Sequence, residues 1–135
     1  MSPNARTLIT LRRRGLIAWP VERWIAQRGI RVDVWSFGDI LAADPRERRI
    51  LLVQATSVSH VAERVAKIQR TPEAAIWLKA GGVIEVWGWA QVRGKWHPKI
   101  VSLRPGDLAP DVIARPPRRG RSRHKQGADL FGSLI

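Results

Sequence analysis

Three polar side chains stand out in the apolar stretch of residues 37–57. Asp39 precedes one apolar run, residues 40–43, and Gln54 and Thr56 lie near the end of a second run, residues 50–57. Two apolar runs of strand length, separated by a charged turn, predict a β-hairpin. Antiparallel pairing then brings Asp39 close to Gln54 and Thr56. Such a group is either a functional site or a hydrogen-bonded polar cluster.

The second run has no polar face, so it is expected to be a central strand that is buried on both sides. Gln54 and Thr56 are two residues apart and therefore leave the strand on the same face. Two further acids, Glu22 and Asp33, lie with Asp39 in a segment that is otherwise apolar or basic. Acids in so basic a chain are candidates for a specific role.

The overall charge indicates a polyanionic partner. The 135 residues include 24 Lys and Arg against 11 Asp and Glu, a formal net charge of +13. Nucleic acid is the first expectation, with an anionic membrane surface and a ribosomal scaffold as lesser alternatives. No apolar run is long enough to span a membrane, and no secretory signal is expected. The absence of cysteine suits a reducing cytoplasm.

Local patterns predict the order of elements. A helix is expected over residues 3–14, a strand over 16–24 that Pro20 confines to an edge or a bulge, and an extended segment over 32–35. After the hairpin, a helix capped by Ser57 or Ser59 leads to a second helix over 72–79 and to strands over 83–89 and 95–103. Apolar periodicity ends near residue 103, so we expect a domain over 1–103 and a flexible basic tail over 104–135.

Two helices carry basic clusters. Arg12, Arg13 and Arg14 end the first helix, where they either favour the negative helix end or bind phosphate. The helix after the hairpin has a basic face that is either simply solvated or a phosphate-binding surface; it comprises His60, Arg64, Lys67 and Arg70. Most of the seven tryptophans are expected to pack in the core or the sheet rather than to stack on bases.

The order of elements, with a lone Asp before one core strand and a polar-x-polar pair in the next, resembles the PD-(D/E)XK superfamily of nucleases. The resemblance covers roughly residues 2–103. It is closest to Holliday-junction resolvases and to small phage-encoded proteins of that fold, over residues 22–24, 31–39, 53–57, 64–68 and 85–89. It implies an α/β fold with a restriction-endonuclease-like core, in which helices flank a mixed central β-sheet. It also implies a location in the cytoplasm of a bacterial or phage-infected cell.

The resemblance also implies a site for Mg²⁺ or Mn²⁺. Asp39 matches the metal-binding Asp, Glu22 is the candidate upstream acid, and Gln54 occupies the position of the usual second carboxylate. The backbone carbonyl of Ala55 is a further candidate ligand. These oxygen atoms suit a hard divalent cation, although the neutral Gln54 weakens the set.

Thr56 occupies the position of the usual catalytic lysine and carries no charge. Lys67, on the following helix, is the candidate replacement. His60, Asp33 or a metal-bound water is expected to handle the proton. DNA contacts are expected from basic residues on the domain and tail, which are Arg12, Arg13, Arg14, Arg31, His60, Arg64, Arg118, Arg119, Arg121, Arg123 and Lys125.

The expected function is metal-dependent hydrolysis of branched or distorted duplex DNA by a homodimer, because a resolvase cuts two strands symmetrically. One alternative is a catalytically degenerate DNA-binding protein of the same fold, favoured by Gln54 and Thr56. A second is a basic RNA-binding or ribosome-associated module.

The tail has two features. Residues 115–125 hold six Lys and Arg side chains, which would add salt-dependent affinity for phosphates. The segment 128–131 is similar to the short peptides that bind the bacterial sliding clamp, with Asp129, Leu130 and Phe131 as its candidate docking residues. The alternative is that this apolar tip folds back onto the domain.

Overall fold

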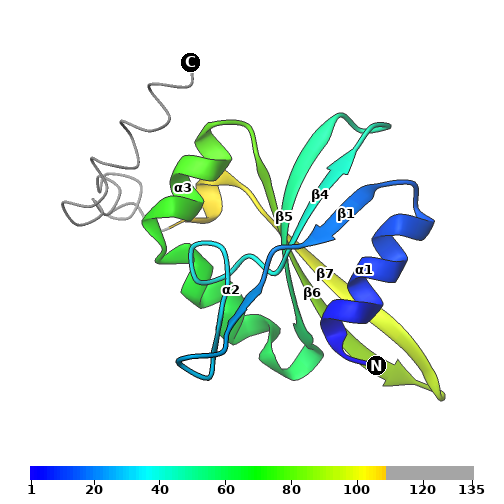
Figure 1. Cartoon of the computed structure of the whole chain (residues 1–135). Coiled ribbons are helices and arrows are strands. Elements are labelled where there is room, and N and C mark those ends of the chain that lie inside the picture. Colours follow the sequence, from blue (N-terminus) through cyan, green and yellow to red (C-terminus); the bar gives the residue numbers. More distant parts are fainter. Residues whose placement is uncertain (109–135) are drawn as a thin grey trace.

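The structure, a computed structural model, describes residues 1–108 and combines helices with a mixed sheet (Figure 1). Its helices are α1 (Pro3–Arg13), α2 (Val61–Gln69) and α3 (Pro72–Lys79), with short 3-10 helices η1 (Val58–His60) and η2 (Pro105–Asp107). Its strands are β1 (Ile17–Pro20), β2 (Arg23–Ile25), β3 (Ile30–Val32), β4 (Ile40–Asp44), β5 (Arg49–Ser57), β6 (Val83–Val92) and β7 (Lys95–Leu103).

Five strands form the main sheet in the order β1-β4-β5-β6-β7. Only the β5–β6 pair is parallel, so the sheet is mixed. One apolar cluster packs α2 and α3 against Leu52, Ile84 and Val86, and a second packs α1 against Leu51 and Val53 on the opposite face. The expected α/β architecture, a mixed central sheet flanked by helices, is therefore confirmed.

The predicted central hairpin is confirmed as β4 and β5. Ile40 lies opposite Val53, and the Asp39 N–H donates to the carbonyl of Val53. Continuing this register places Asp39 opposite Gln54, on the same face of the sheet. β5 is the third of five strands, and its residues 51–54 are buried, as expected for a central strand.

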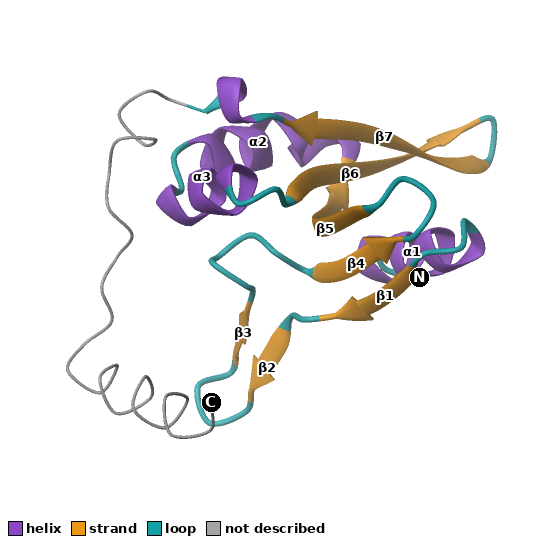
Figure 2. Ribbon diagram, turned by 90° about the horizontal axis from the view of Figure 1, so that it is seen from above, coloured by secondary structure: helices purple, strands orange, loops and turns teal. Residues whose placement is uncertain are grey.

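The predicted strand over 16–24 is wrong as one element. It is divided into β1, which is an edge strand as expected, and β2, which pairs with β3 in a separate two-stranded ribbon. The break follows Pro20, where the N–H groups of Val21 and Glu22 both donate to the carbonyl of Asp39. The chain therefore leaves the main sheet at this point, and Figure 2 shows the β2–β3 ribbon extending away from it.

The seven tryptophans are divided between the core and the surface. Trp87 and Trp89 are buried, and four others are exposed, which are Trp19, Trp24, Trp35 and Trp96. Two smaller features differ from expectation. Ser57 precedes η1 rather than capping α2, and neither it nor His60 makes a side-chain cap. Leu108 is buried in the cluster with α3, five residues past the expected domain boundary.

The expectations for the basic tail and its apolar tip lie outside the described residues. Among residues 1–108, none of the helices has the length and apolar character needed to cross a membrane.

Candidate metal centre

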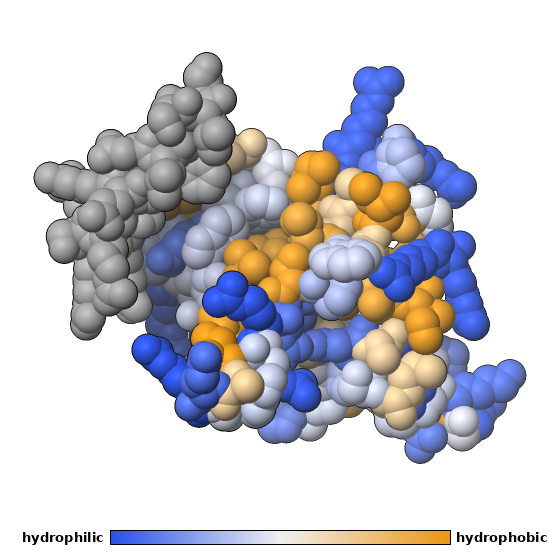
Figure 3. Space-filling model, in the orientation of Figure 1, coloured by the Kyte–Doolittle hydropathy of each residue, from blue (hydrophilic) through white to orange (hydrophobic). Residues whose placement is uncertain are grey.

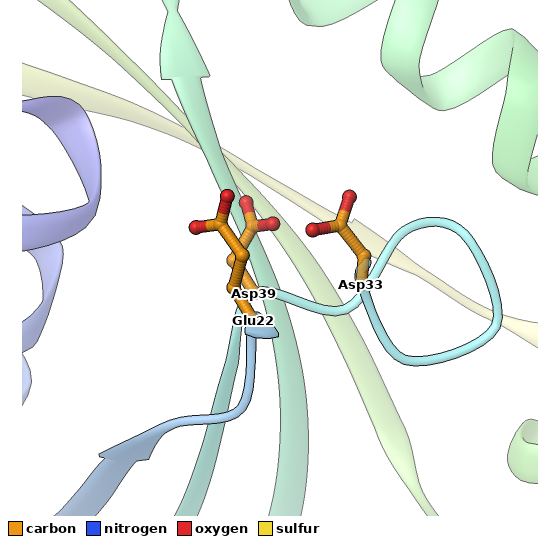
Figure 4. A group of neighbouring side chains, drawn as sticks. All are labelled: Glu22, Asp33 and Asp39. Atoms are coloured by element: carbon orange, nitrogen blue, oxygen red, sulfur yellow. The ribbon is translucent and has the colours of Figure 1, made fainter. Parts of the chain in front are cut away.

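Three carboxylates converge at one end of the β4–β5 pair. Glu22, Asp33 and Asp39 each offer an oxygen atom, and these atoms lie within 4.8 Å of one another. Glu22 directly precedes β2, Asp33 directly follows β3, and Asp39 directly precedes β4. Figure 4 shows the three carboxylates directed to the same side of the chain. We refer to these three residues as the acidic site.

A tight turn brings Asp33 and Asp39 together. The backbones of Val34 and Gly38 exchange two hydrogen bonds, of 2.9 and 2.8 Å, and so close the turn between the two acids. A Cβ atom on Gly38 would lie 2.6 Å from the side chain of Leu52, so only glycine allows the turn to approach β5 this closely. The turn therefore places Asp33 close to Asp39 and packs against β5.

Backbone hydrogen bonds hold Glu22 beside Asp39. The Val21 and Glu22 N–H groups donate to the Asp39 carbonyl at 2.9 and 3.3 Å. The Glu22 carboxylate accepts from Asn4 Nδ2 at 2.6 Å and forms a 3.5 Å ion pair with the exposed Arg31. α1 and the β2–β3 ribbon thus both help to position this acid.

Asp39 is the most buried acid of the site, with a relative exposure of 5%. Its Oδ2 accepts a 2.9 Å hydrogen bond from the N–H of Ala55. Burial raises the pKa of Asp39 to about 7; the Ala55 N–H opposes this shift, whereas the nearby Asp33 and the charge of Glu22 add to it. A cation at the site would relieve the burial cost and the mutual repulsion of the carboxylates.

Gln54 adds an oxygen atom that lacks a donor. Its side chain is 2% exposed, and Oε1 has no hydrogen-bond partner in the part of the chain that the structure describes. Leaving a buried acceptor unpaired costs about 1–3 kcal/mol. Because Gln54 lies opposite Asp39 on the same sheet face, a cation or its water could satisfy this oxygen. Three carboxylates and an amide oxygen fit the donor set of Mg²⁺ or Mn²⁺.

The other predicted catalytic residues are not members of the acidic site. Thr56 is buried on the same face of β5 as Gln54. Lys67 is exposed and donates from Nζ to the carbonyl of Ser36, at 2.7 Å, within the turn that joins the acids. His60 is exposed and pairs with Glu63 at 3.4 Å.

The predicted arginine cluster is not brought to the acidic site. Arg12 and Arg13 lie in the last turn of α1 and Arg14 is its C-cap, whereas Asn4, in the first turn, contacts Glu22. Eight residues of helix separate Asn4 from Arg12, or about 12 Å. Arg12 instead donates to the carbonyl of Ala18, at 2.8 and 3.1 Å, and so ties α1 to β1.

The sequence did not assign Asp33 as a ligand. It was expected only as one of three groups that could handle a proton, yet it completes the acidic site. The sequence offers one signal for this role. A tight turn over residues 34–38 would bring the chain back from Asp33 to Asp39.

No family model matches the chain, and no curated protein or solved structure shows significant similarity to it.

Proposed function

We propose that this protein is a metal-dependent endonuclease that hydrolyses DNA phosphodiester bonds, preferentially in branched or distorted duplexes. The observation that carries the proposal is the convergence of three carboxylates in a chain of formal charge +13. A basic surface attracts the phosphate backbone, but an acidic site repels it. A divalent cation bound between the acidic site and the phosphate removes that repulsion. Metal-dependent hydrolysis of DNA uses such a bridging cation.

The ligands proposed here extend the expected set. Glu22, Asp39 and Asp33 supply anionic oxygens, so Asp33 compensates for the neutral Gln54. The N–H and C=O of one strand residue point to the same side, and the Ala55 N–H points to Asp39. The Ala55 carbonyl therefore faces the acidic site and is a further candidate ligand. When bound, Mg²⁺ or Mn²⁺ would supply an activated water and neutralise charge on the phosphate.

Lys67 and Asp33 are assigned the remaining roles. The Lys67 ammonium is held against the Ser36 carbonyl, which places a positive charge beside the turn that carries both aspartates. Asp33 is less buried than Asp39, so a carboxylate oxygen of Asp33 that the cation does not hold is the candidate to accept a proton from water. Thr56 contributes no charge and is assigned only packing and hydrogen bonding on the face of β5.

The finer fold assignment, a restriction-endonuclease-like core, is part of the same proposal. It is supported by a helix, a strand and a hairpin followed by helices and a strand, β6, parallel to β5. It is also supported by the positions of Asp39, before β4, and of Gln54 and Thr56, near the end of β5.

A homodimer is proposed because two strands must be cut symmetrically, and one face of the sheet favours it. Figure 3 shows apolar side chains gathered over β1 and β4; four are exposed around a groove of about 300 Å³, which are Ile17, Trp19, Leu41 and Ile50. Within residues 1–108, β1 is also an unpaired edge without charged residues, whereas the other edge, β7, carries Lys95 and Lys99. We expect Trp19→Glu to convert a dimer into a monomer in sedimentation equilibrium.

A second candidate function is DNA binding without cleavage. Gln54 is neutral at the position where the resemblance expects a carboxylate, and Thr56 is neutral where it expects a lysine. The Lys67 ammonium already donates a hydrogen bond to the carbonyl of Ser36. These features weaken cation binding and stabilisation of the transition state. The basic surface would remain functional in such a protein.

One experiment separates the two candidates. The protein is incubated with a four-way junction and with a linear duplex, each in Mg²⁺, Mn²⁺ or EDTA, and the products are resolved on a denaturing gel. The endonuclease predicts cuts in the junction with metal and none in EDTA. Binding of the junction without cuts in either metal would establish the second candidate instead.

A further inference from the structure

The β2–β3 ribbon is built directly onto the acidic site. Glu22 immediately precedes β2 and Asp33 immediately follows β3, so two of the three acids form the root of this hairpin. Figure 2 shows the ribbon extending away from the main sheet. A phosphodiester bound at the acids would therefore lie beside the ribbon.

The surface of the ribbon is both basic and apolar. Of residues 23–32, only Ile25 is half-buried, and the other nine are exposed. The segment holds three arginines and no acid. It also exposes apolar side chains, which are Trp24 at 59%, Ile30 at 45% and Val32 at 40%. Positive charge complements a nucleic acid, and an exposed indole offers a stacking surface.

Cross-strand pairing decides which side of the ribbon faces the acids. Trp24 lies opposite Arg31, so their side chains share one face. The Arg31 guanidinium reaches Glu22 at 3.5 Å. The face that carries Trp24 is therefore the face adjacent to the acidic site.

The chemistry of an exposed indole favours distorted DNA over a regular duplex. In a regular duplex, a tryptophan can stack on a base only after neighbouring base pairs are separated, which costs a few kcal/mol. Branch points and unpaired segments present base faces without that cost. A two-stranded ribbon also has the width that the major groove admits.

We propose that the β2–β3 ribbon recognises distorted DNA, with Trp24 stacking on an accessible base at the branch and with Arg23 and Arg28 contacting backbone phosphates. The inference rests on the proposed function in that DNA is the ligand of the acidic site. It adds an element that selects the DNA structure and places the distortion beside the acids.

Binding measured in EDTA tests this separately from cleavage. The full chain and its variants are titrated, by fluorescence anisotropy, against a four-way junction and a linear duplex with the same arm sequence. Trp24→Ala is compared with Trp96→Ala, which removes an exposed tryptophan of β7 distant from the ribbon along the chain. Because both side chains are exposed, equal thermal unfolding of the two variants checks that each folds.

We expect Trp24→Ala to weaken junction binding at least fivefold and duplex binding less than twofold, since loss of one stacked base corresponds to about that factor or more. Trp96→Ala should leave the junction preference unchanged. Equal effects of the two substitutions, or equal losses on both DNAs, would overturn the stacking role. Unchanged binding by Trp24→Ala would instead assign the exposed side chains to a protein contact.

The arginines give an independent readout. The double variant Arg23→Ala/Arg28→Ala should weaken binding to both DNAs and reduce the slope of log K against log salt by about 2, one unit for each phosphate contact. An unchanged slope would contradict phosphate contact. If no metal supports cleavage but these binding effects are observed, the endonuclease proposal fails and the ribbon remains the DNA-recognition element.

Discussion

Two groups of acids lie at opposite ends of the β4–β5 pair and have opposite electrostatic surroundings. At one end is Asp39 with its two neighbours; at the other is Asp44, the last residue of β4, near Glu85 of β6. Burial by itself raises the pKa of Asp44, but the N–H of Glu47, the guanidinium of Arg49 and the N–H of Arg46 together hold it below its usual value. An aspartate is thus stabilised as an anion at the Asp44 end of the pair but not at the Asp39 end.

The group around Asp44 contains its own cation. Arg49 pairs with Asp44 at 3.3 Å and with Glu85 at 3.5 Å, and Glu85 also accepts from Trp87 Nε1 and Ser102 Oγ. In residues 1–108, by contrast, no Lys or Arg side chain bonds to Asp33 or Asp39. The Asp44 group therefore holds its cation within the fold, whereas in the acidic site only Glu22 has a cationic partner, the exposed Arg31, among the described residues.

The largest expected effect is on cleavage. Asp39→Asn retains the shape and the acceptor for the Ala55 N–H but removes a metal-binding charge, so we expect a rate loss on the order of 10³-fold or more. Asp44→Asn removes an acid of the same type at the other end and should change the rate less than about threefold. Single-turnover cleavage of a junction with saturating protein measures both. Equal losses would show that the two ends do not differ in function.

The raised pKa of Asp39 predicts a loss of stability as pH rises. Below about pH 4, Asp39 is protonated in both the folded and the unfolded chain. Between the ordinary aspartate pKa of 3.8 and about 7 only the folded chain retains the proton, so the free energy of unfolding falls as pH rises through this window. The difference of roughly three pKa units corresponds to at most about 4 kcal/mol.

Urea unfolding of the wild type and of Asp39→Asn, without metal, isolates this contribution. The variant should exceed the wild type in stability at pH 8, and the difference should shrink steadily toward pH 4. Saturating Mn²⁺ should remove most of the difference at pH 8, because it compensates the buried charge. A difference that is constant with pH would assign the effect to packing rather than to ionisation.

Local sequence patterns predicted the β4–β5 hairpin and the start of α3. Apolar runs on both sides of a charged turn are enough to indicate β4, β5 and the approach of Asp39 to Gln54. The start of α3 is likewise local, since Thr71 and Pro72 favour a helix N-terminus. These features depend on neighbouring residues, and the structure has the α3 bounds that were expected.

The parts that were missed depend on longer-range packing. The turn that brings Asp33 to Asp39 holds Trp35 and Ser36 at positive φ, which their residue types do not favour. Arg49 neutralises Glu85 across 36 residues, a pairing that requires knowledge of the parallel β5–β6 register. Sequence patterns could therefore identify the acids, but not which of them have a cation within the fold.

A smaller effect is expected from removing the cation of the Asp44 group. Arg49→Met leaves Asp44 and Glu85 without their shared guanidinium, and we expect a loss of about 2 kcal/mol, because the pair is largely buried but Arg49 itself remains partly exposed. Arg31→Met removes an exposed partner of Glu22 and should cost less than about 0.5 kcal/mol. Urea unfolding at pH 7.5 measures both; equal losses would contradict the structural role of Arg49.

A tenfold effect on metal affinity is expected from adding a charge to the acidic site. Gln54→Glu would supply a carboxylate at the one buried side-chain oxygen of residues 1–108 that lacks a partner, and we expect Mn²⁺ to bind about tenfold more tightly, or about 1.4 kcal/mol. Without metal the same variant should be less stable than the wild type, because a fourth acid increases repulsion in a buried site. Calorimetric titration with Mn²⁺ measures the affinity, and Gln54→Met serves as the control that removes the oxygen without adding charge. If the glutamate variant binds Mn²⁺ no better than the methionine variant, residue 54 does not face the cation, and Asp33 alone replaces the missing carboxylate.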